Sequence, residues 1–482
     1  MSLSSIEELP AQGAPAEGLS TQESSDESSR QRSHAVLRQS SSVFSAQMLS
    51  LGAGVLCTYL LARLGGAEGK GWIYRLQLLA GIGLVLVNAG LGPAAVFLHR
   101  REPGEGRTGV NKIDVEETAS LLLWPSLLLG SLPLGLLELS RLAPALFHPG
   151  SWRAPAELAF AVLPACTLLW NLSYFYLATG RIAAYNRLRA SQSCLFALLL
   201  VSLCFTHAAG VQRLTLCWMA SMTVPALIAL MALSRSVGFC RLPAPALLRR
   251  ALGFAWRSHL GAVVQYLQHR TDVVLILWLL PIRELGVYSL AIGVVELLWY
   301  VPQAVSQVLL PHIAGSTEAD ANRITSTFCR ASVAITALLS LTLAALSSWA
   351  IPRLLPAFRE SVPVIWILLP GTVVASVFKV LASDLNGRGQ PLKTVFPATV
   401  ALLFSAAGCW WVLPRFGLRG AAVVTSLSYF LNAALYIASY ARLPEMNLRS
   451  LTLLNSSDLA WCFSSLRGTS RGLVAWRRRW ES

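Results

Sequence analysis

The residues in this sequence that could do chemistry are ionisable side chains inside long apolar segments. Arg270 and Asp272 lie near the middle of residues 251–281, Glu296 interrupts a later apolar segment, and Arg75 lies just inside an earlier one. A charged side chain at the centre of a membrane-spanning helix costs about 2.5 to 3.5 kcal/mol, so such residues normally face a helix bundle or a water-filled path. They are therefore the first candidates for a functional site.

The helix predicted over residues 251–281 carries its polar residues on two faces. At 100° per residue, Arg270 and Asp272 point about 200° apart, so they cannot pair with each other along the helix. One face carries His259, Tyr266 and Arg270, and the other carries Ser258, Gln265, His269 and Asp272. Each charge either joins this helix to a neighbour through an ion pair, or lines a cavity in which Arg270 attracts an anion and Asp272 binds a cation or proton.

The composition excludes a soluble protein. The chain of 482 residues is 54% hydrophobic and 13% charged, against about 25% charged residues in ordinary soluble domains. The formal net charge of +15 is typical of an orientation signal in a membrane protein, so it does not predict nucleic-acid binding. The nine cysteines show no metal-ligand spacing and are expected to be small core residues, so neither a metal site nor a cofactor is predicted.

Apolar segments of spanning length predict an all-α polytopic membrane protein with about twelve transmembrane helices in two six-helix lobes. A spanning helix needs about 20 apolar residues. The predicted spans are residues 42–64, 72–98, 118–137, 158–178, 190–207, 214–233, 251–281, 286–313, 331–350, 361–381, 394–413 and 420–441.

Charge and composition divide the chain further. Residues 1–41 are predicted to be a disordered cytoplasmic tail, residues 42–233 an N-lobe, residues 234–250 a basic cytoplasmic loop, residues 251–441 a C-lobe, and residues 442–482 a basic cytoplasmic tail that is either disordered or lies on the membrane surface. Lys and Arg are more numerous in the termini and in the loops on the same predicted side of the membrane than in the loops on the opposite side. This predicts that both termini are cytoplasmic.

Two short repeats support the division into lobes. Gly71-Trp-Ile-Tyr74 is echoed by Gly286-Val-Tyr-Ser289, and Leu177-Ala-Thr-Gly180-Arg181 by Leu385-Asn-Gly387-Arg388. Because six helices separate the copies, the lobes should share one orientation and be related by an axis along the membrane normal.

Several motifs give the chain a family resemblance. Leu285-Gly-Val-Tyr-Ser-Leu-Ala291, followed by Pro302 and Pro311, resembles a "GxYxxA... P... LxP" pattern, and Leu413-Pro414 with Phe416-Gly-Leu-Arg-Gly-Ala-Ala422 resembles "LIPxxGxxGAA". Leu64-Gly-Gly66 with Asn88-Ala-Gly-Leu-Gly92 is similar to an N-terminal "LG...G...LGL" pattern. These are patterns of the oligosaccharide flippases (Wzx-type), the polysaccharide-biosynthesis branch of the multidrug/oligosaccharidyl-lipid/polysaccharide exporter superfamily.

The resemblance implies an alternating-access flippase that is not an enzyme. It would carry a polyprenyl-diphosphate-linked oligosaccharide across the cytoplasmic (inner) membrane for O-antigen, capsule or exopolysaccharide assembly, among membrane lipids and with a polysaccharide polymerase as a possible partner. Arg270 is the candidate phosphate contact, with Tyr266 and His259 on its face. Arg stays protonated and can bind phosphate oxygens in bidentate fashion.

The other candidate site residues have two readings each. Arg63 and Arg75 are either a release site or anchors that reach the membrane surface. Asp272 and Glu296 either couple transport to protons or sodium or form an ion pair with Arg270. Uncharged polar residues either bind sugars or join helices; they are Asn88, Asn171, Gln192, Gln303, Gln307 and Asn432.

Two other functions remain open as alternatives. One is a cation-coupled drug or small-molecule antiporter of the same superfamily. The other is a membrane-bound glycan polymerase or ligase, which would be expected to carry a large outward loop, and the sequence has none of clear catalytic composition. The sequence also has no phosphate-binding Gly-rich loop with Lys and no spaced nucleophile and base, which disfavours an ATP-driven pump.

Overall fold

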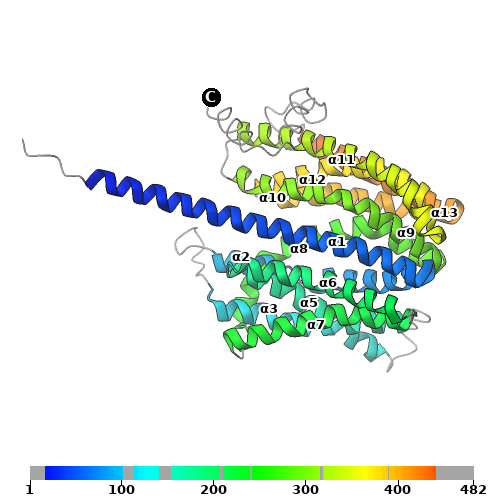
Figure 1. The fold of residues 1–482 in the computed structure, drawn as a ribbon, viewed down its shortest axis with the longest axis horizontal. Helices are drawn as coiled ribbons and strands as arrows, with labels where there is room; N and C mark the ends of the chain where they lie inside the picture. The colour runs from blue at the N-terminus through cyan, green and yellow to red at the C-terminus, as the bar shows by residue number, and fades with distance from the viewer. Residues whose placement is uncertain are drawn as a thin grey trace, which may run out of the picture.

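The computed structural model describes residues 17–100, 113–140, 153–206, 210–238, 241–314, 318–388 and 390–440, and all regular secondary structure in these ranges is helical. Figure 1 shows the helices running with their long axes in roughly one direction, as helices crossing a membrane do. The predicted all-α fold is therefore confirmed. The helices are α1 (Glu17–Val87), α2 (Leu91–Arg100), α3 (Val115–Leu139), α4 (Arg153–Ala161), α5 (Leu163–Ala178), α6 (Ile182–Thr206), α7 (Val211–Val237), α8 (Pro245–Leu279), α9 (Ile282–Val295), η3 (Glu296–Trp299), α10 (Tyr300–Ala314), α11 (Glu318–Leu354), η4 (Pro356–Phe358), α12 (Ser361–Gly387), η5 (Pro391–Thr394) and α13 (Val395–Tyr440).

The two longest elements are α1 and α13: α13 contains the last two predicted spans, and α1 contains the first and most of the second, which is interrupted at residues 88–90 and continues in α2. The break in each is a glycine with positive φ, Gly66 at 60° and Gly417 at 56°, a conformation that residues with a Cβ rarely adopt. The two legs of α13 pack on each other, because the Ser428 hydroxyl donates to the Ala401 carbonyl at 3.0 Å. Nine candidate spans lie in the described residues. The candidate spans in α1 and in α13 each consist of two legs. Counting each leg separately and adding α8 gives the twelve predicted segments.

The predicted eighth span is not one continuous α-helix. It consists of α9, the 3₁₀ turn η3 and α10. Glu296 therefore lies in a 3₁₀ turn between two α-helices. Pro302 explains the change, because it has no N–H and its ring crowds the carbonyl four residues earlier, at Leu298 within η3.

Among the predicted boundaries that differ from the structure, two concern the segments that were expected to be irregular. Helix α1 begins at Glu17, whereas residues 1–41 were expected to be irregular; extending an existing helix through polar residues avoids the cost of nucleating one. Helix α8 begins at Pro245, inside the expected loop of residues 234–250, because Pro is favourable at the first helical positions. Residues 1–16 and the predicted tail 442–482 lie outside the described residues.

The boundary between the lobes is tightest at two glycines. A Cβ on Gly71 would lie 2.1 Å from the Ile282 carbonyl oxygen, and a Cβ on Gly286 would lie 1.8 Å from the Ala67 carbonyl oxygen. Only glycine permits this approach between α1 and α9. Gly71 and Gly286 begin the two copies of the repeat found in the sequence, so equivalent positions of the two lobes meet here, as expected for an axis between them. We call this contact the glycine seam.

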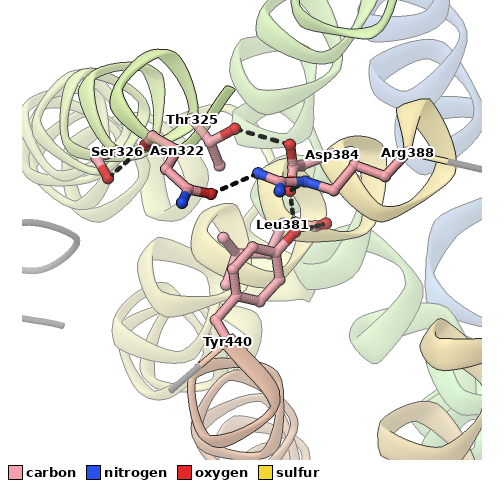
Figure 2. Close-up of polar contacts among 7 residues, drawn as sticks. All are labelled: Asn322, Thr325, Ser326, Leu381, Asp384, Arg388 and Tyr440. Atoms are coloured by element: carbon pink, nitrogen blue, oxygen red, sulfur yellow. Dashed lines mark hydrogen bonds and ion pairs between the residues drawn. The ribbon is translucent and has the colours of Figure 1, made fainter. Parts of the chain in front are cut away.

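A buried polar network joins three helices inside the C-lobe (Figure 2). Asp384 of α12 accepts from Thr325 of α11 at 2.9 Å and from Arg388 Nε at 2.8 Å, and it also accepts from the Tyr440 hydroxyl of α13. Arg388 also donates to Asn322 at 2.7 Å. Because Asp384 is fully buried and has several donors, the network ties α11, α12 and α13 into one unit.

Candidate functional site

Arg270 lies where three elements meet at the boundary between the lobes. Its Nη1 is 2.8 Å from Glu296 Oε1 in η3 and donates to the Tyr74 hydroxyl of α1 at 3.1 Å. Tyr266, one turn earlier on α8, lies beside Arg270 as well. The side chains of Arg270 and Glu296 keep 21% and 27% of their surface exposed, so neither side chain is fully buried.

A second cation lies beside this ion pair. Lys379 of α12 has its Nζ 4.0 Å from the centre of the Trp299 ring, and it interacts electrostatically with Glu296 and Arg270. His269 packs on the same Trp299 ring, with centroids 4.8 Å apart. Arg270, Glu296 and Lys379, which we call the charge cluster, carry one more positive than negative charge, so the cluster suits an anion.

Asp272 lies on the other side of α8 and does not pair with Arg270. Its Oδ2 accepts from the Tyr288 hydroxyl of α9 at 2.6 Å and from the Thr425 hydroxyl of α13 at 2.8 Å, and its Oδ1 accepts from the Val273 N–H at 2.8 Å. It is 3% exposed. The prediction that the two charges serve different faces is confirmed, and of the two acids it is Glu296 that forms the ion pair with Arg270.

A cavity of about 650 Å³ lies next to the charge cluster, between the N-lobe and α10. Its walls come from α1, α5, α6 and α7 together with Tyr300, Gln303 and Ala304 of α10. The polar side chains among its lining residues are amides, hydroxyls, ring N–H groups and one arginine, Arg189, and none is a carboxylate.

Two helices lead from the charge cluster into this cavity. On α1, Tyr74 contacts Arg270, and Gln77 and Gly81, on the same helix face, line the cavity. Beyond Glu296 of η3, Tyr300 and Gln303 line it at i+4 and i+7. Gly81 also faces the Tyr266 hydroxyl, which a Cβ at that position would approach to 2.2 Å. The cluster therefore lies about one turn beyond the cavity wall on both helices.

The remaining predicted site residues lie apart from the cluster. His259, on the same face as Arg270, packs against Gly90 in the turn between α1 and α2. Arg63 is exposed and donates to Tyr59 at 3.2 Å, and Arg75 lies over the Trp72 ring at 5.8 Å. Their role in substrate release stays a prediction.

The polar residues predicted either to bind sugars or to join helices lie in different places in the structure. Gln192 and Gln303 line the cavity. Asn171, in contrast, donates to Ser126 at 2.8 Å and joins α5 to α3. Asn88 and Asn432 are not among the cavity lining.

Lys379 and Arg189 were missed by the analysis of the sequence. Lys379 could have been found by the rule that identified Arg270, because it is a charge inside the predicted span 361–381. Arg189 lies just before the predicted start of its span at residue 190, where basic residues ordinarily mark a membrane surface. Only the folded chain brings it beside Trp170, 5.3 Å from that ring.

Known proteins give the fold independent support. The chain is similar to the lipid II flippase MurJ in an inward closed conformation, with a TM-score of 0.67 and 14% identity over 89% of this chain and 93% of that chain. It is also similar to a multidrug resistance MATE family transporter of the MOP superfamily, in an inward-facing conformation (TM-score 0.64, 14% identity, 83% and 98% covered) and in an outward-facing one (0.57, 13%, 85% and 95%).

These structural relatives are flippases and transporters, in agreement with the prediction that the chain is not an enzyme. No curated protein sequence matches the chain. Residues 192–357 match the family described as "Polysaccharide biosynthesis protein". The resemblance read from the sequence motifs is thereby confirmed: the chain has the fold of these flippase and transporter structures, and residues 192–357 carry the sequence pattern of a polysaccharide-biosynthesis family.

Proposed function

We propose that the chain is an alternating-access flippase that moves a polyprenyl-diphosphate-linked oligosaccharide from the inner to the outer leaflet of the cytoplasmic membrane, for assembly of a cell-surface polysaccharide. The observation that carries the proposal is the partly exposed Arg270, held between the lobes by Glu296 and Tyr74 about one turn beyond the wall of a cavity. A polymerase that uses the delivered oligosaccharide is the expected class of partner, and both termini are expected in the cytoplasm.

The charge cluster suits a diphosphate. A diphosphate cannot cross about 30 Å of hydrocarbon unaided, whereas a guanidinium can bind its oxygens through two parallel hydrogen bonds. Lys379 supplies a second positive charge beside Arg270. In the unloaded protein Glu296 holds Arg270 in position; an arriving phosphate replaces this carboxylate, so the cation is never left unpaired within the membrane.

The boundary between the lobes is closed by the glycine seam at one end and borders the cavity toward the other, and this arrangement supports alternating access. The glycine seam closes the lobe boundary near the turn at Gly66. Gly81, which lines the cavity, is ten residues beyond Gly71, or roughly 15 Å at 1.5 Å per residue. The inward-facing transporter matches this chain with a higher TM-score, 0.64, than the outward-facing one, 0.57. Rocking the lobes apart at the seam would expose the charge cluster on the other side.

Asp272 is the proposed ion-coupling residue. Glu296 is already paired with Arg270, whereas Asp272 is buried and accepts hydrogen bonds from hydroxyl and amide donors. A buried carboxylate is costly in its charged form, so a proton or sodium ion would stabilise it. Binding of an ion at Asp272 would change its hydrogen bonds to Tyr288 of α9 and Thr425 of α13. Helix α9 forms one side of the glycine seam.

A cation-coupled drug antiporter is less well supported. Recognition of a cationic drug favours carboxylates or a net negative site, and the cavity lining contains none, while the charge cluster is net positive. A polymerase or ligase would need clustered acid and base groups at one membrane surface, and the charge cluster lies between the lobes instead.

The test is transport by variants of Arg270. In reconstituted vesicles, Arg270→Ala should reduce the rate of glycolipid translocation at least tenfold, and Arg270→Lys should retain part of it because the charge remains. Glu296→Gln should bind the lipid more tightly but release it more slowly, because the competing carboxylate is gone. Wild-type translocation by the Ala variant would remove Arg270 from the mechanism.

A further inference from the structure

We propose that two pairs of tryptophan and arginine at one end of the C-lobe bind the phosphate groups of anionic membrane lipids. The pairs are Trp349 with Arg353 on α11 and Trp411 with Arg415 on α13, and we call them the Trp–Arg pairs. The inference goes beyond the proposed function, because it concerns the surface that faces lipid and not the path between the lobes.

The two pairs belong to two copies of one sequence pattern. One copy reads Trp349-Ala-Ile-Pro-Arg353, and the other reads Trp411-Val-Leu-Pro-Arg415. The middle residues, Ile351 and Leu413, are buried in the same hydrophobic core, whereas all four residues of the pairs are exposed. Each copy is thus anchored in the C-lobe by its middle residue, with its tryptophan and arginine on the outside.

The geometry of the two pairs is the same. In each, the guanidinium carbon lies 5.1 Å from the centre of the tryptophan ring, and the arginine Nη1 donates to the tryptophan carbonyl oxygen at 3.0 Å. The ring and the carbonyl therefore hold each guanidinium in place. A guanidinium has five N–H donors, so an anion at the exposed side can accept from those that the carbonyl does not use.

The arginine is not a requirement of the helix end itself. The shorter pattern Trp-x-x-Pro occurs four times in residues 251–441, and the residue that follows it is Ile282, Gln303, Arg353 or Arg415. Ile282 lies at the glycine seam, and Gln303 lines the cavity. Arginine follows only in the two copies that lie away from both places, which points to a role at the outer surface of the protein.

The surroundings of the pairs place them at the level of lipid headgroups. Tryptophan side chains concentrate at membrane–water interfaces, and four here are each at least 55% exposed: Trp349, Trp366, Trp410 and Trp411. Helix α11 ends just beyond its pair, and α13 breaks just beyond its own, both at the end of the molecule where α1 turns (Figure 1). In the orientation proposed above, this end faces the outer leaflet.

A lipid phosphate suits the chemistry of each pair. A guanidinium binds two phosphate oxygens through parallel hydrogen bonds, and arginines near a membrane surface attract anionic lipids. A zwitterionic lipid carries an ammonium close to its phosphate, and this group repels the guanidinium. The preferred ligand is therefore an anionic phospholipid such as phosphatidylglycerol. Helix α12 packs against both α11 and α13, so we expect two separate sites.

The lipids retained by the full chain test this inference. The protein is placed in nanodiscs of equal parts phosphatidylglycerol and phosphatidylcholine, the nanodiscs are disrupted gently, and native mass spectrometry counts each lipid on the protein. Wild-type protein should retain phosphatidylglycerol in preference to phosphatidylcholine. Arg353→Gln combined with Arg415→Gln should lower the affinity for phosphatidylglycerol about tenfold. The double lysine variant should keep part of the affinity, because the charges remain but the fork is lost.

A matched double variant separates the pairs from general attraction to charge. Arg359→Gln combined with Arg419→Gln removes two exposed arginines near the same helix ends, but neither arginine follows a Trp-x-x-Pro pattern. This variant should retain phosphatidylglycerol as the wild type does. In nanodiscs of phosphatidylcholine alone, both glutamine variants should unfold at the wild-type temperature, which shows that they are folded.

Three outcomes would overturn the inference. Equal loss of phosphatidylglycerol in the two glutamine variants would show attraction by net charge alone, and equal retention of the two lipids by the wild type would show no preference for an anionic lipid. Displacement of the retained lipid by soluble glycerol phosphate would assign the pairs to a free phosphate instead. The transport assays that test the proposed function are independent of all three.

Discussion

At the scale of single residues, two charges on one helix have different surroundings because of their angular spacing. Arg270 faces α1 and η3, where its ion pair stays partly exposed, whereas Asp272 faces α9 and α13, where hydroxyl donors surround it. A partly exposed ion pair can exchange its carboxylate for a phosphate. A buried, hydrogen-bonded carboxylate instead responds to small ions or holds its neighbours in place.

Asp272→Asn separates these two roles. If Asp272 couples transport, the variant should lose the dependence of glycolipid translocation on an imposed proton or sodium gradient, because an amide binds neither ion well. Thr425→Val is the matched control, since it removes one donor but keeps the carboxylate. It should lower the stability by about 1 kcal/mol and keep the gradient dependence. Unchanged gradient dependence in Asp272→Asn would leave this residue a structural role only.

At the scale of elements, the glycine seam holds α1 against α9 with backbone atoms in direct contact. Gly286→Ala would place a Cβ 1.8 Å from the Ala67 carbonyl oxygen. The backbone of α1 or α9 would have to move to relieve this clash. Gly293→Ala on the same helix is a suitable control, because its nearest neighbour would be the Thr58 side chain at 3.8 Å, an ordinary contact.

We expect Gly286→Ala to hold the lobes apart at the seam and to slow transport. Spin labels at the exposed positions Glu68 and Arg283, in a background without native cysteines, should show a longer distance in Gly286→Ala and no change in Gly293→Ala. Equal distances in both variants would mean that the seam does not set the separation of the lobes.

The network around Asp384 acts within one lobe. Asp384→Asn leaves Arg388 without its carboxylate in a buried site, so the free energy of unfolding should fall by about 3 to 5 kcal/mol. Thr325→Val removes one neutral donor and should cost only about 1 kcal/mol. Chemical unfolding in detergent measures both, and equal losses would show that the ion pair adds nothing beyond one hydrogen bond.

At the scale of the whole molecule, the proposed transport path combines the two lobes, the seam and the cavity. Cells that lack the chain should accumulate lipid-linked oligosaccharide that stays on the inner leaflet, while their efflux of cationic drugs should not change. A lipid profile with a leaflet-accessibility assay and a radiolabelled drug efflux measurement separate the two. Normal oligosaccharide levels with impaired drug efflux would favour the antiporter.

Much of the fold could be predicted from the sequence, because spanning helices need long apolar segments that are visible without any contact information. The twelve segments, the two lobes and the placement of Arg270, Asp272 and Glu296 within the helix bundle followed from hydrophobicity and from the cost of charge in hydrocarbon. The 3₁₀ turn at Glu296 and the early start of α8 were not predicted, since each depends on where a proline lies relative to a helix end.

The sequence by itself determined that the chain crosses a membrane many times and keeps charges within it. Only the tertiary structure decided which acid pairs with Arg270, that Lys379 lies beside them, and that Gln192, Gln303 and Trp170 share one cavity. The physical reason is that burial in the membrane is a property of each segment alone, whereas partners and cavities arise where helices far apart in the chain pack together.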